Sequence, residues 1–235
     1  MLTALTLRPN VSCVNINLMT TESIEHSTYH HGDLRAALVK AAAAEIERSG
    51  YENLSLRELA ESLGVSRAAP YRHFADRRAL LAALAADGFD ALTAIHRKAI
   101  AAHRTPHARL TAAGRGYLAF AAERPQLFRL MFVSDLLTAG AAPPDAGLIK
   151  SANESYQVFE GMVAATLDDP DDAAVKAVTI AIMSTTYGFA LLRMGDRLKP
   201  FMYGGLTQGQ LIDAVLSMKV TALPRAAGRK RAKKA

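Results

Sequence analysis

The sequence predicts an all-α fold, and three observations support this prediction. Alanine-rich segments with an apolar residue every three or four positions make up most of the chain. The alternation of apolar and polar residues that indicates a half-buried β-strand is nearly absent. Half of the 235 residues are hydrophobic, which is enough for a substantial core in one or two domains. We therefore expect a small N-terminal helical unit followed by a larger helical domain.

Residues 1–28 are expected to form a flexible N-terminal arm. Their opening stretch, LTALTLRPNVSCVNINL, lacks the basic start and the clean apolar centre of a signal peptide. Met19 is an alternative start site, which mass spectrometry of the native N-terminus would test. His30, His31 and Asp33 come next, but adjacent residues make a poor tetrahedral set. We therefore expect them to lead into the first helix rather than to bind a metal.

The segment SLRELAESLGVSRAAPYRHF, which begins at Ser55, has the pattern of a helix-turn-helix. Apolar residues recur at i+3, i+4 and i+7 after Leu56, which predicts a short helix. Gly64 is expected to end it in the left-handed conformation, which costs glycine little. Ser66 is expected to cap a second short helix. Such pairs are typical of proteins that place the second helix in the major groove of DNA.

The side chains of the expected second helix suit DNA better than a protein core. The guanidinium of Arg67 can donate two hydrogen bonds to guanine, and Ala68 and Ala69 allow a close approach and contact with a thymine methyl. Arg57, in the first helix, is a further cation for the same surface. Three polar side chains suited to phosphate oxygens follow: Tyr71, Arg72 and His73. The alternative interpretation is a plain helical hairpin with a charged, solvated face.

Residues 31 to about 95 resemble the DNA-binding domain of TetR-family transcriptional regulators. The resemblance rests on a helix at 34–49, the break Gly50-Tyr51, the sequence YRHF at 71–74 and a polar-basic start to a long fourth helix. The family usually has lysine at that start, where this chain has Arg77 after the expected N-cap Asp76. The resemblance implies a three-helix DNA-binding domain at 29–95. It implies backbone contacts at Ser55, Ser66, Tyr71, His73 and Arg77, and base contacts at Arg57, Arg67, Ala68 and Ala69.

Helical periodicity continues through a second domain, expected at 96–223. The fourth helix is expected to end near His103, and the later helices are expected at 108–123, 126–136, 148–167, 173–194 and 207–223. The sequence DDPDD at 168–172 predicts a stop and a restart, with Asp169 as N-cap and Pro170 at the first helical position. The segment has four carboxylates, but it lacks the ligand spacing and the closing Glu of a calcium-binding loop, so we do not expect it to bind calcium.

The last two expected helices are apolar on more than one side. Helix 173–194 has a bulky stripe beside a stripe of small residues, and helix 207–223 is apolar over a wide arc. The apolar residues concerned are Val175, Val178, Ile182 and Phe189, and Leu211, Ile212, Val215, Leu216 and Met218. A terminal helix of this kind needs partners on both sides. The family resemblance implies that both helices pair with their copies in the four-helix interface of a homodimer.

The resemblance also implies a pocket for a small apolar effector among the middle helices. Bulky candidates for its lining are Phe120, Phe128, Met131, Phe132, Tyr156, Phe159, Met162, Met183 and Tyr187. The stretch MSTTYGF at 183–189 resembles the Trp-x-x-x-His-Gly segment of one C-terminal TetR subfamily. Gly188 matches it, whereas Met183 stands at the tryptophan position and Tyr187 at the histidine position.

The net charge of +6 is not the observation that indicates DNA binding. The tail RAAGRKRAKKA at 225–235 carries six basic residues and no acidic one, so the rest of the chain balances at 22 basic against 22 acidic residues. The local cluster of Arg67, Arg72, Arg77 and Arg78 is the relevant charge. Residues 224–235 are expected to be disordered, and either add sequence-independent attraction to nucleic acid or act only as a solubilising end.

Catalytic and membrane-spanning interpretations find little support in the sequence. No GxSxG, HExxH or P-loop motif occurs. Gly114–Ala119 fits a dinucleotide fingerprint by letter, but it lies in a helical pattern with no strand before it. No run of about 18 uncharged apolar residues is present. The lone Cys13 fits a reducing cytoplasm, and we expect neither a cofactor nor a metal.

Together these features predict a cytoplasmic, ligand-responsive transcriptional regulator. The expected form is a homodimeric repressor that a small molecule releases from a roughly palindromic operator. Two alternatives remain open: a transcriptional activator, and a ligand-independent architectural DNA-binding protein.

Overall fold

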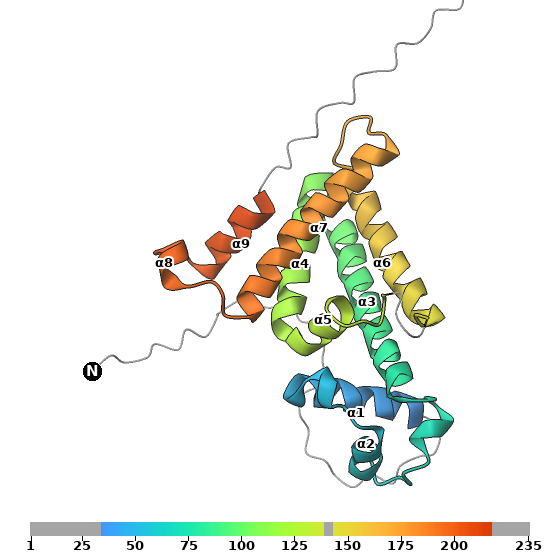
Figure 1. Ribbon diagram of the computed structural model, residues 1–235. Helices are drawn as coiled ribbons and strands as arrows, with labels where there is room; N and C mark the ends of the chain where they lie inside the picture. Colours follow the sequence, from blue (N-terminus) through green and yellow to red (C-terminus); the bar gives the residue numbers. More distant parts are fainter. Residues whose placement is uncertain (1–33, 139–142, 218–235) are drawn as a thin grey trace, which may run out of the picture. The chain divides into compact units, whose positions relative to one another are not determined.

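The structure, a computed structural model, describes residues 34–138 and 143–217, and every regular element within them is helical (Figure 1). The helices, with two 3₁₀ turns, are α1 (Leu34–Ser49), η1 (Tyr51–Asn53), α2 (Leu56–Ser62), η2 (Pro70–Arg72), α3 (Arg77–Ala102), α4 (Pro106–Glu123), α5 (Pro125–Phe132), α6 (Ala146–Ala164), α7 (Asp172–Met194), α8 (Pro200–Tyr203) and α9 (Gln208–Ser217). The all-α prediction is confirmed. The predicted arm at 1–28, the histidine pair that follows it, Met218 and the basic tail lie outside the described residues.

The N-terminal helices contribute to an apolar core that continues into the later helices. Leu38, Ala42 and Ile46 lie at i, i+4 and i+8 on α1, and all three are fully buried. They belong to the same apolar cluster as Leu56 of α2 and Phe74, which are also buried. Helix α1 has the predicted bounds.

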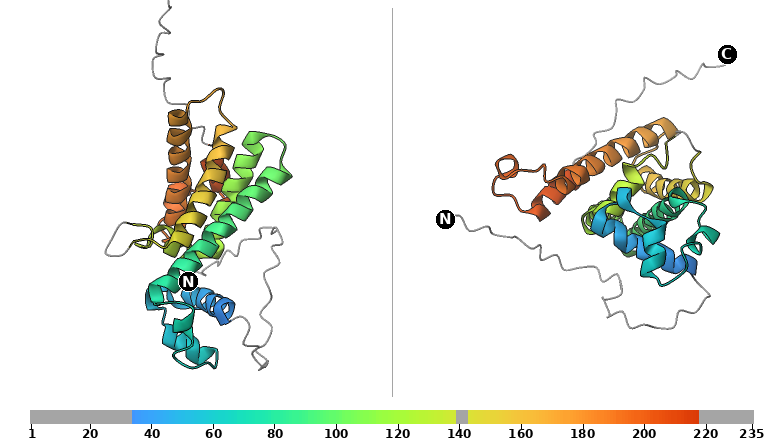
Figure 2. Two further views of the ribbon diagram at one scale, coloured as in Figure 1. Left: turned by 90° about the vertical axis from the view of Figure 1, so that its right-hand side faces the viewer. Right: turned by 60° about the horizontal axis from the view of Figure 1, so that its bottom comes forward.

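Helix α3 is the central helix of the described chain. The carboxylate of Asp76 accepts a hydrogen bond from the Ala79 amide at 2.8 Å, so this residue caps the helix as predicted. The helix ends at His103, also as predicted, where the backbone becomes extended. It packs against α4, α5 and α6, and Figure 2 shows it alongside α4 and α6. Because one helix joins the N-terminal helices to the later ones, the described residues form one compact unit.

Two glycines of α4 allow neighbouring helices to approach closely. A Cβ atom at Gly116 would overlap Cγ2 of Ile95 on α3, and one at Gly114 would overlap Cδ2 of Leu216 on α9. Both glycines lie in the interior of α4. The glycine pattern that fits a dinucleotide fingerprint by letter is therefore explained by helix packing.

The predicted N-cap of α7, Asp169, is wrong by two residues. Asp171 is the N-cap, and its carboxylate accepts a hydrogen bond from the Ala174 amide at 2.7 Å. Asp169 has a left-handed φ of 47° and continues the turn after α6, so Pro170 precedes the cap instead of opening the helix. Helices α5 and α6 also end earlier than predicted, and the sequence does not predict α8, which is a single turn.

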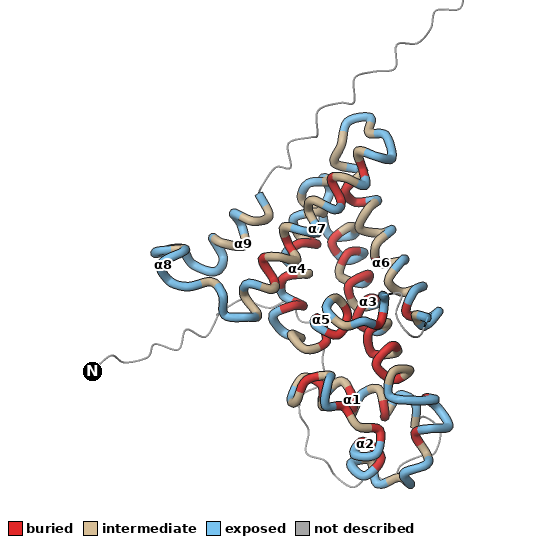
Figure 3. The backbone as a smooth tube through the Cα atoms, viewed as in Figure 1, coloured by how far each residue is buried: buried red, intermediate tan, exposed pale blue. Residues whose placement is uncertain are grey.

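Helix α7 leaves part of its apolar surface uncovered. Both α3 and α7 are long and apolar enough to cross a membrane by length and composition, but helices of a folded core meet the same criterion. In α3, 56% of the relevant window is buried, whereas in α7 the fraction is 28%. Ile180, Met183 and Leu192 of α7 are exposed, and no described residue of α9 is fully buried (Figure 3). Within the part of the chain that the structure describes, the other helices leave α7 and α9 only partly covered.

Candidate nucleic-acid interface and its connection to the helical body

The first half of the predicted helix-turn-helix folds as expected. The hydroxyl of Ser55 accepts a hydrogen bond from the Glu58 amide at 3.4 Å and caps α2. Leu56 and Leu59 face the core. Gly64 ends the helix with a φ of 66°, which an L-residue with a Cβ rarely adopts. The turn chemistry predicted from the sequence is confirmed.

The second half is not a capped α-helix. It forms a turn and the short 3₁₀ turn η2, whose N-cap is Ala69 without a side-chain hydrogen bond. The carbonyl of Ser66, and not its hydroxyl, accepts the Ala69 amide at 2.9 Å. An α-helix starting here would need an amide of residue 70 to bond that carbonyl, and Pro70 has none. The predicted cap by Ser66 is therefore wrong, because proline favours the shorter i→i−3 bond.

The residues predicted to contact DNA nevertheless share an exposed surface. Tyr71 is 54% exposed, and Ala69 is half-buried. The others on this segment and on α2 are exposed: Arg57, Ser66, Arg67, Ala68, Arg72 and His73. Pro70 and Phe74 are buried on the other side of the segment and anchor it to the core. The guanidinium of Arg35 lies 5.2 Å from the Phe74 ring centroid and adds to this anchor.

Arg67, the main predicted base reader, is held by an ion pair in this structure. Its Nη2 lies 2.6 Å from Oε1 of Glu61, and its Nε donates to the same oxygen at 3.0 Å. The two side chains are 61% and 52% exposed. Exposed pairs of this kind contribute about 0–1 kcal/mol, so releasing Arg67 for another acceptor costs little.

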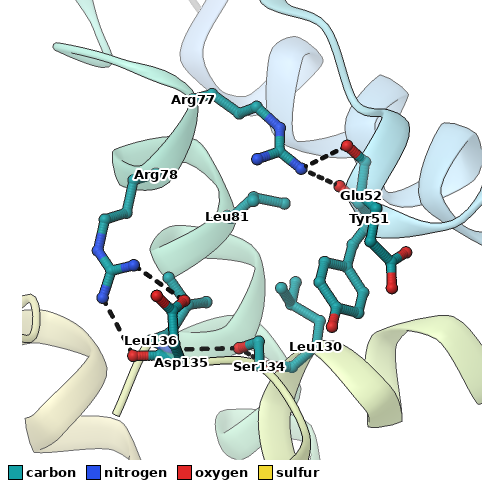
Figure 4. Close-up of a pocket in the computed structure, with 9 residues that line it drawn as sticks. All are labelled: Tyr51, Glu52, Arg77, Arg78, Leu81, Leu130, Ser134, Asp135 and Leu136. Carbon is teal, nitrogen blue, oxygen red and sulfur yellow. Dashed lines mark hydrogen bonds and ion pairs between the residues drawn. The ribbon is translucent and has the colours of Figure 1, made fainter. Parts of the chain in front are cut away.

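Arg77 has a structural task that the sequence does not reveal. Its guanidinium donates to the carbonyl oxygen of Leu54 at 2.9 Å. It also donates to the carbonyl oxygens of Glu52, at 2.9 Å, and Tyr51 (Figure 4). These bonds connect the first residue of α3 to the segment that leads into the helix-turn-helix. Among the described residues Nη1 has no bonded acceptor, so the phosphate contact expected of Arg77 remains a prediction.

Helix α5 is fastened to the N-terminal helices at both ends. The carboxylate of Glu47 on α1 accepts the Gln126 and Leu127 amides at 3.1 and 3.0 Å, which caps α5 from a distant helix. Beyond the other end, Arg78 donates from Nη1 to the Asp135 carboxylate at 3.0 Å and from Nη2 to its carbonyl at 3.1 Å. The sequence does not reveal this connection, because Glu47 lies 79 residues from its nearest partner.

A hollow of about 310 Å³ lies beside this connection (Figure 4). Leu81, Leu130 and Leu136 form its apolar wall, while Arg77 and Arg78 stand at its edge with their acceptors. The hollow lies between the bonds of Arg77 to Tyr51 and Glu52 and the bonds of Arg78 to Asp135.

Three of the predicted effector-pocket residues meet in an aromatic cluster. Phe128, Phe132 and Tyr187 have ring centroids 4.7 to 6.0 Å apart, and Phe89 and Tyr117 complete the cluster. Phe128 is fully buried, and burial is the main cause that raises the pKa of Tyr117. The cluster joins α5 to α3, α4 and α7, so the packed core contains these side chains.

The other predicted pocket residues are dispersed. Phe120 and Met131 are buried in the same core, and Met183 is 37% exposed on α7. The hydroxyl of Tyr156 donates to Glu160 one turn later at 2.8 Å. Met162 lines a second hollow of about 270 Å³ between the end of α3, the start of α4 and α6. That hollow is the place where a predicted pocket residue borders open space.

A buried histidine beside this region is not among the site residues predicted from the sequence. His96 on α3 is 6% exposed, and its ring centroid lies 5.4 Å from that of Phe159, the remaining predicted pocket residue. Burial lowers its pKa to about 4. Leu92, His96 and Ile100 occupy i, i+4 and i+8, so a histidine in the apolar stripe was the signal available in the sequence.

Comparisons with known proteins agree with this architecture. Residues 38–84 match the bacterial regulatory proteins of the tetR family, and residues 110–216 match a tetracyclin repressor-like C-terminal domain. A Rhodococcus sp. RHA1 protein of unknown function is 34% identical, with a TM-score of 0.65, over 80% of this chain and 92% of its own. The comparison with curated proteins gave no match.

Two more distant structures share the fold. The TetR-family regulator PfmR from Thermus thermophilus is 18% identical, with a TM-score of 0.55, over 80% of this chain and 99% of its own. The regulator FadR from Bacillus subtilis, solved in complex with stearoyl-CoA, is 16% identical, with a TM-score of 0.58, over the same fractions.

Proposed function

This chain belongs to the TetR family of bacterial regulatory proteins, DNA-binding transcription factors rather than enzymes, and from this premise we propose that it is a homodimeric repressor. In this proposal two copies bind a roughly palindromic operator in the cytoplasm, and a small apolar effector releases them. The observation that carries the proposal is the exposed segment from Ser66 to His73, which is anchored from behind by buried Pro70 and Phe74.

This segment supports DNA recognition through its geometry and its charge. Tyr71, Arg72 and His73 offer donors to phosphate oxygens at one end, and the small side chains of Ala68 and Ala69 leave room for the DNA at the other. Arg67 exchanges its weak ion pair with Glu61 for a guanine edge when it meets the operator. Few side chains read bases, so operator symmetry and DNA shape contribute to specificity.

Selection of binding sites from a random DNA pool tests the proposal. We expect enrichment of a palindrome whose half-sites are about 34–36 Å apart, the distance between successive major grooves on one face. Arg67→Ala should weaken binding to the selected site more than binding to random DNA, because a base contact is lost. Arg97→Ala is the matched control, since Arg97 is an exposed cation of the body paired with Glu154. An unpaired half-site, or equal losses on both DNAs for Arg67→Ala, would contradict the assignment.

The uncovered surfaces of α7 and α9 support a homodimer. Ile180 is 58% exposed, and Met183 and Leu192 on the same helix are 37% and 40% exposed. Apolar surface of this kind is stabilised when a second copy covers it, and a two-fold interface uses the same patch twice. The four-helix interface proposed here pairs α7 and α9 of each subunit.

Sedimentation of the full chain tests this interface. We expect a dimer at micromolar concentration that Ile180→Glu converts to monomer, because the substitution buries two carboxylates across a two-fold axis. Ile149→Glu is the matched control, since Ile149 is a comparably apolar, 39% exposed residue on α6. A monomeric wild-type chain, or a dimer that survives Ile180→Glu, would contradict the proposed interface.

The proposed effector acts by changing the spacing of the two DNA-binding units. Helix α3 runs from the helix-turn-helix into the body, and α5 is bonded to α1 through Glu47, so a change in the packing of the body reaches both. Coupling of this type is typically about 1–3 kcal/mol, or roughly 5- to 150-fold in affinity. A compound that raises the melting temperature and releases the operator would support the sensor. An operator complex that no stabilising compound releases would favour an architectural role.

A further inference from the structure

Between α3 and α6 lies a buried nitrogen atom to which no described residue forms a hydrogen bond. Nδ1 of His96 is buried and has no hydrogen-bond partner in the described part of the chain. Most buried polar atoms have a partner, because an unpaired one loses its bonds to water and gains nothing. Thr93, on the same helix and equally buried, donates its hydroxyl to the Phe89 carbonyl at 3.0 Å. His96 differs from this neighbour in keeping an open hydrogen-bonding position.

The surroundings of His96 are apolar and keep the ring neutral. The Phe159 ring of α6 lies against it, with the two planes inclined by 32°. Burial is the cause of its lowered pKa, about 4, and no neighbouring charge contributes. At neutral pH the ring therefore carries one N–H and one bare nitrogen.

The second hollow lies close to this position. Ile100 and Met162 line it, and they stand one helical turn beyond His96 on α3 and Phe159 on α6, respectively. One turn of a helix is about 5.4 Å, so these two lining residues lie about one turn from the contact between His96 and Phe159, although neither ring lines the hollow itself. Its other lining residues are largely apolar: Pro106, Val158, Gly161 and Ala165, with Arg109 and Gln157.

We propose that His96 is the polar recognition point of the effector site, and that the effector is a small, uncharged, largely apolar molecule that carries a hydroxyl group. A hydroxyl both donates and accepts, so it satisfies Nδ1 in either tautomer of the ring. A carboxylate cannot donate, so it satisfies Nδ1 only in the tautomer that carries the proton on that atom. The inference rests on the proposed function, because it names the chemical class to which the proposed sensor responds.

Matched pairs of phenols and hydrocarbons test the inference on the full-length protein without DNA. The probes are 4-methylphenol, 4-tert-butylphenol and 1-naphthol, each compared with the compound in which methyl replaces the hydroxyl. An apolar site without a polar partner favours the hydrocarbon, because the phenol must lose its bonds to water. By calorimetry we expect at least one phenol to bind about tenfold more tightly than its isostere, as one neutral hydrogen bond allows.

Three variants assign that preference to His96. His96→Leu should abolish or reverse it and should raise the melting temperature of the free protein, because the unpaired nitrogen is gone. His96→Gln keeps a donor and an acceptor and should retain the preference if the leucine variant packs poorly. Thr93→Val, which removes a paired hydroxyl from the same helix, should leave it unchanged.

Three results would overturn the inference: no phenol of the series binds, the hydrocarbons bind as tightly to the wild-type chain, or the preference survives in His96→Leu. DNA takes no part in these measurements, so their failure is distinguishable from that of the proposed function. If the protein prefers phenols but selects no operator, the proposed role of His96 is supported and the proposed function is contradicted. If it selects an operator but does not bind phenols, the proposed function is supported and this effector class is contradicted.

Discussion

Acidification should destabilise this protein through His96. The pKa of the buried imidazole is lowered to about 4 from its ordinary value of 6.5, because burial disfavours the charged ring. As pH falls below 6.5 the unfolded chain takes up a proton on this residue, and the folded chain does not do so until near pH 4. The stabilising contribution is therefore complete above pH 6.5 and is lost progressively between pH 6.5 and pH 4.

The magnitude follows from the size of the shift. Each pKa unit corresponds to about 1.4 kcal/mol, so the full loss is about 3 kcal/mol, of which about 2 kcal/mol is lost by pH 5. Urea unfolding followed by far-ultraviolet circular dichroism at pH 8, 7, 6 and 5 measures it. The other titrating groups also contribute to the wild-type curve, so the relevant quantity is its difference from the curve of His96→Leu.

The free energy of unfolding should fall less steeply with acid for His96→Leu than for the wild type. The difference between the two free energies should be about 2 kcal/mol larger at pH 5 than at pH 8. A constant difference in stability between the two proteins does not affect this comparison of slopes. Parallel curves for the two proteins would refute the reasoning, because they would show that the imidazole is protonated as readily in the folded chain as in the unfolded one.

Substitutions at three further positions test the local structure by urea unfolding. Glu47→Ala should cost about 1–2 kcal/mol, because it removes the cap of two α5 amides, and Glu47→Gln should cost less since one acceptor remains. Arg77→Lys should cost about 1–3 kcal/mol, because an ammonium cannot reproduce a fork that spans three carbonyls. Gly64→Ala should cost about 1–2 kcal/mol from its φ of 66° alone, since no atom lies near the added methyl group. An unchanged unfolding midpoint would show that the feature concerned does not contribute to stability: the cap for Glu47→Ala, the guanidinium hydrogen bonds for Arg77→Lys, or the left-handed backbone for Gly64→Ala.

Much of the fold could be predicted because its signals are local. The bounds of α1, the cap of α3 by Asp76 and the left-handed Gly64 each depend on residues within one or two turns. The errors arise where one local signal outweighs another. Pro70 lacks the amide that a helix capped by Ser66 requires, and the left-handed Asp169 leaves Asp171 as the N-cap of α7.

The candidate site could be predicted only in part. The surface from Ser66 to His73 is recognisable in sequence, because turn, charge and small side chains are adjacent in the chain. The ion pair that holds Arg67 is also local, but the choice of Glu61 over the other acids nearby depends on how the turn folds. The pocket residues were harder to predict, since an aromatic side chain at helical spacing fits a packed core and a cavity lining equally well. Phe128 and Phe132 proved to be packed in the core.

The sequence by itself determined that this protein is helical and that a capped helix and a glycine turn precede the exposed segment from Ser66 to His73, because periodicity, caps and turn residues act over a few positions. Tertiary structure decided what several single residues do. Arg77 binds carbonyls 23 to 26 residues away, and Glu47 caps a helix about 80 residues away. His96 is left with an unused nitrogen only because α3 turns it toward Phe159 on α6. Hydrogen-bond partners and burial are set by which helices meet, and that meeting depends on the packing of the whole chain.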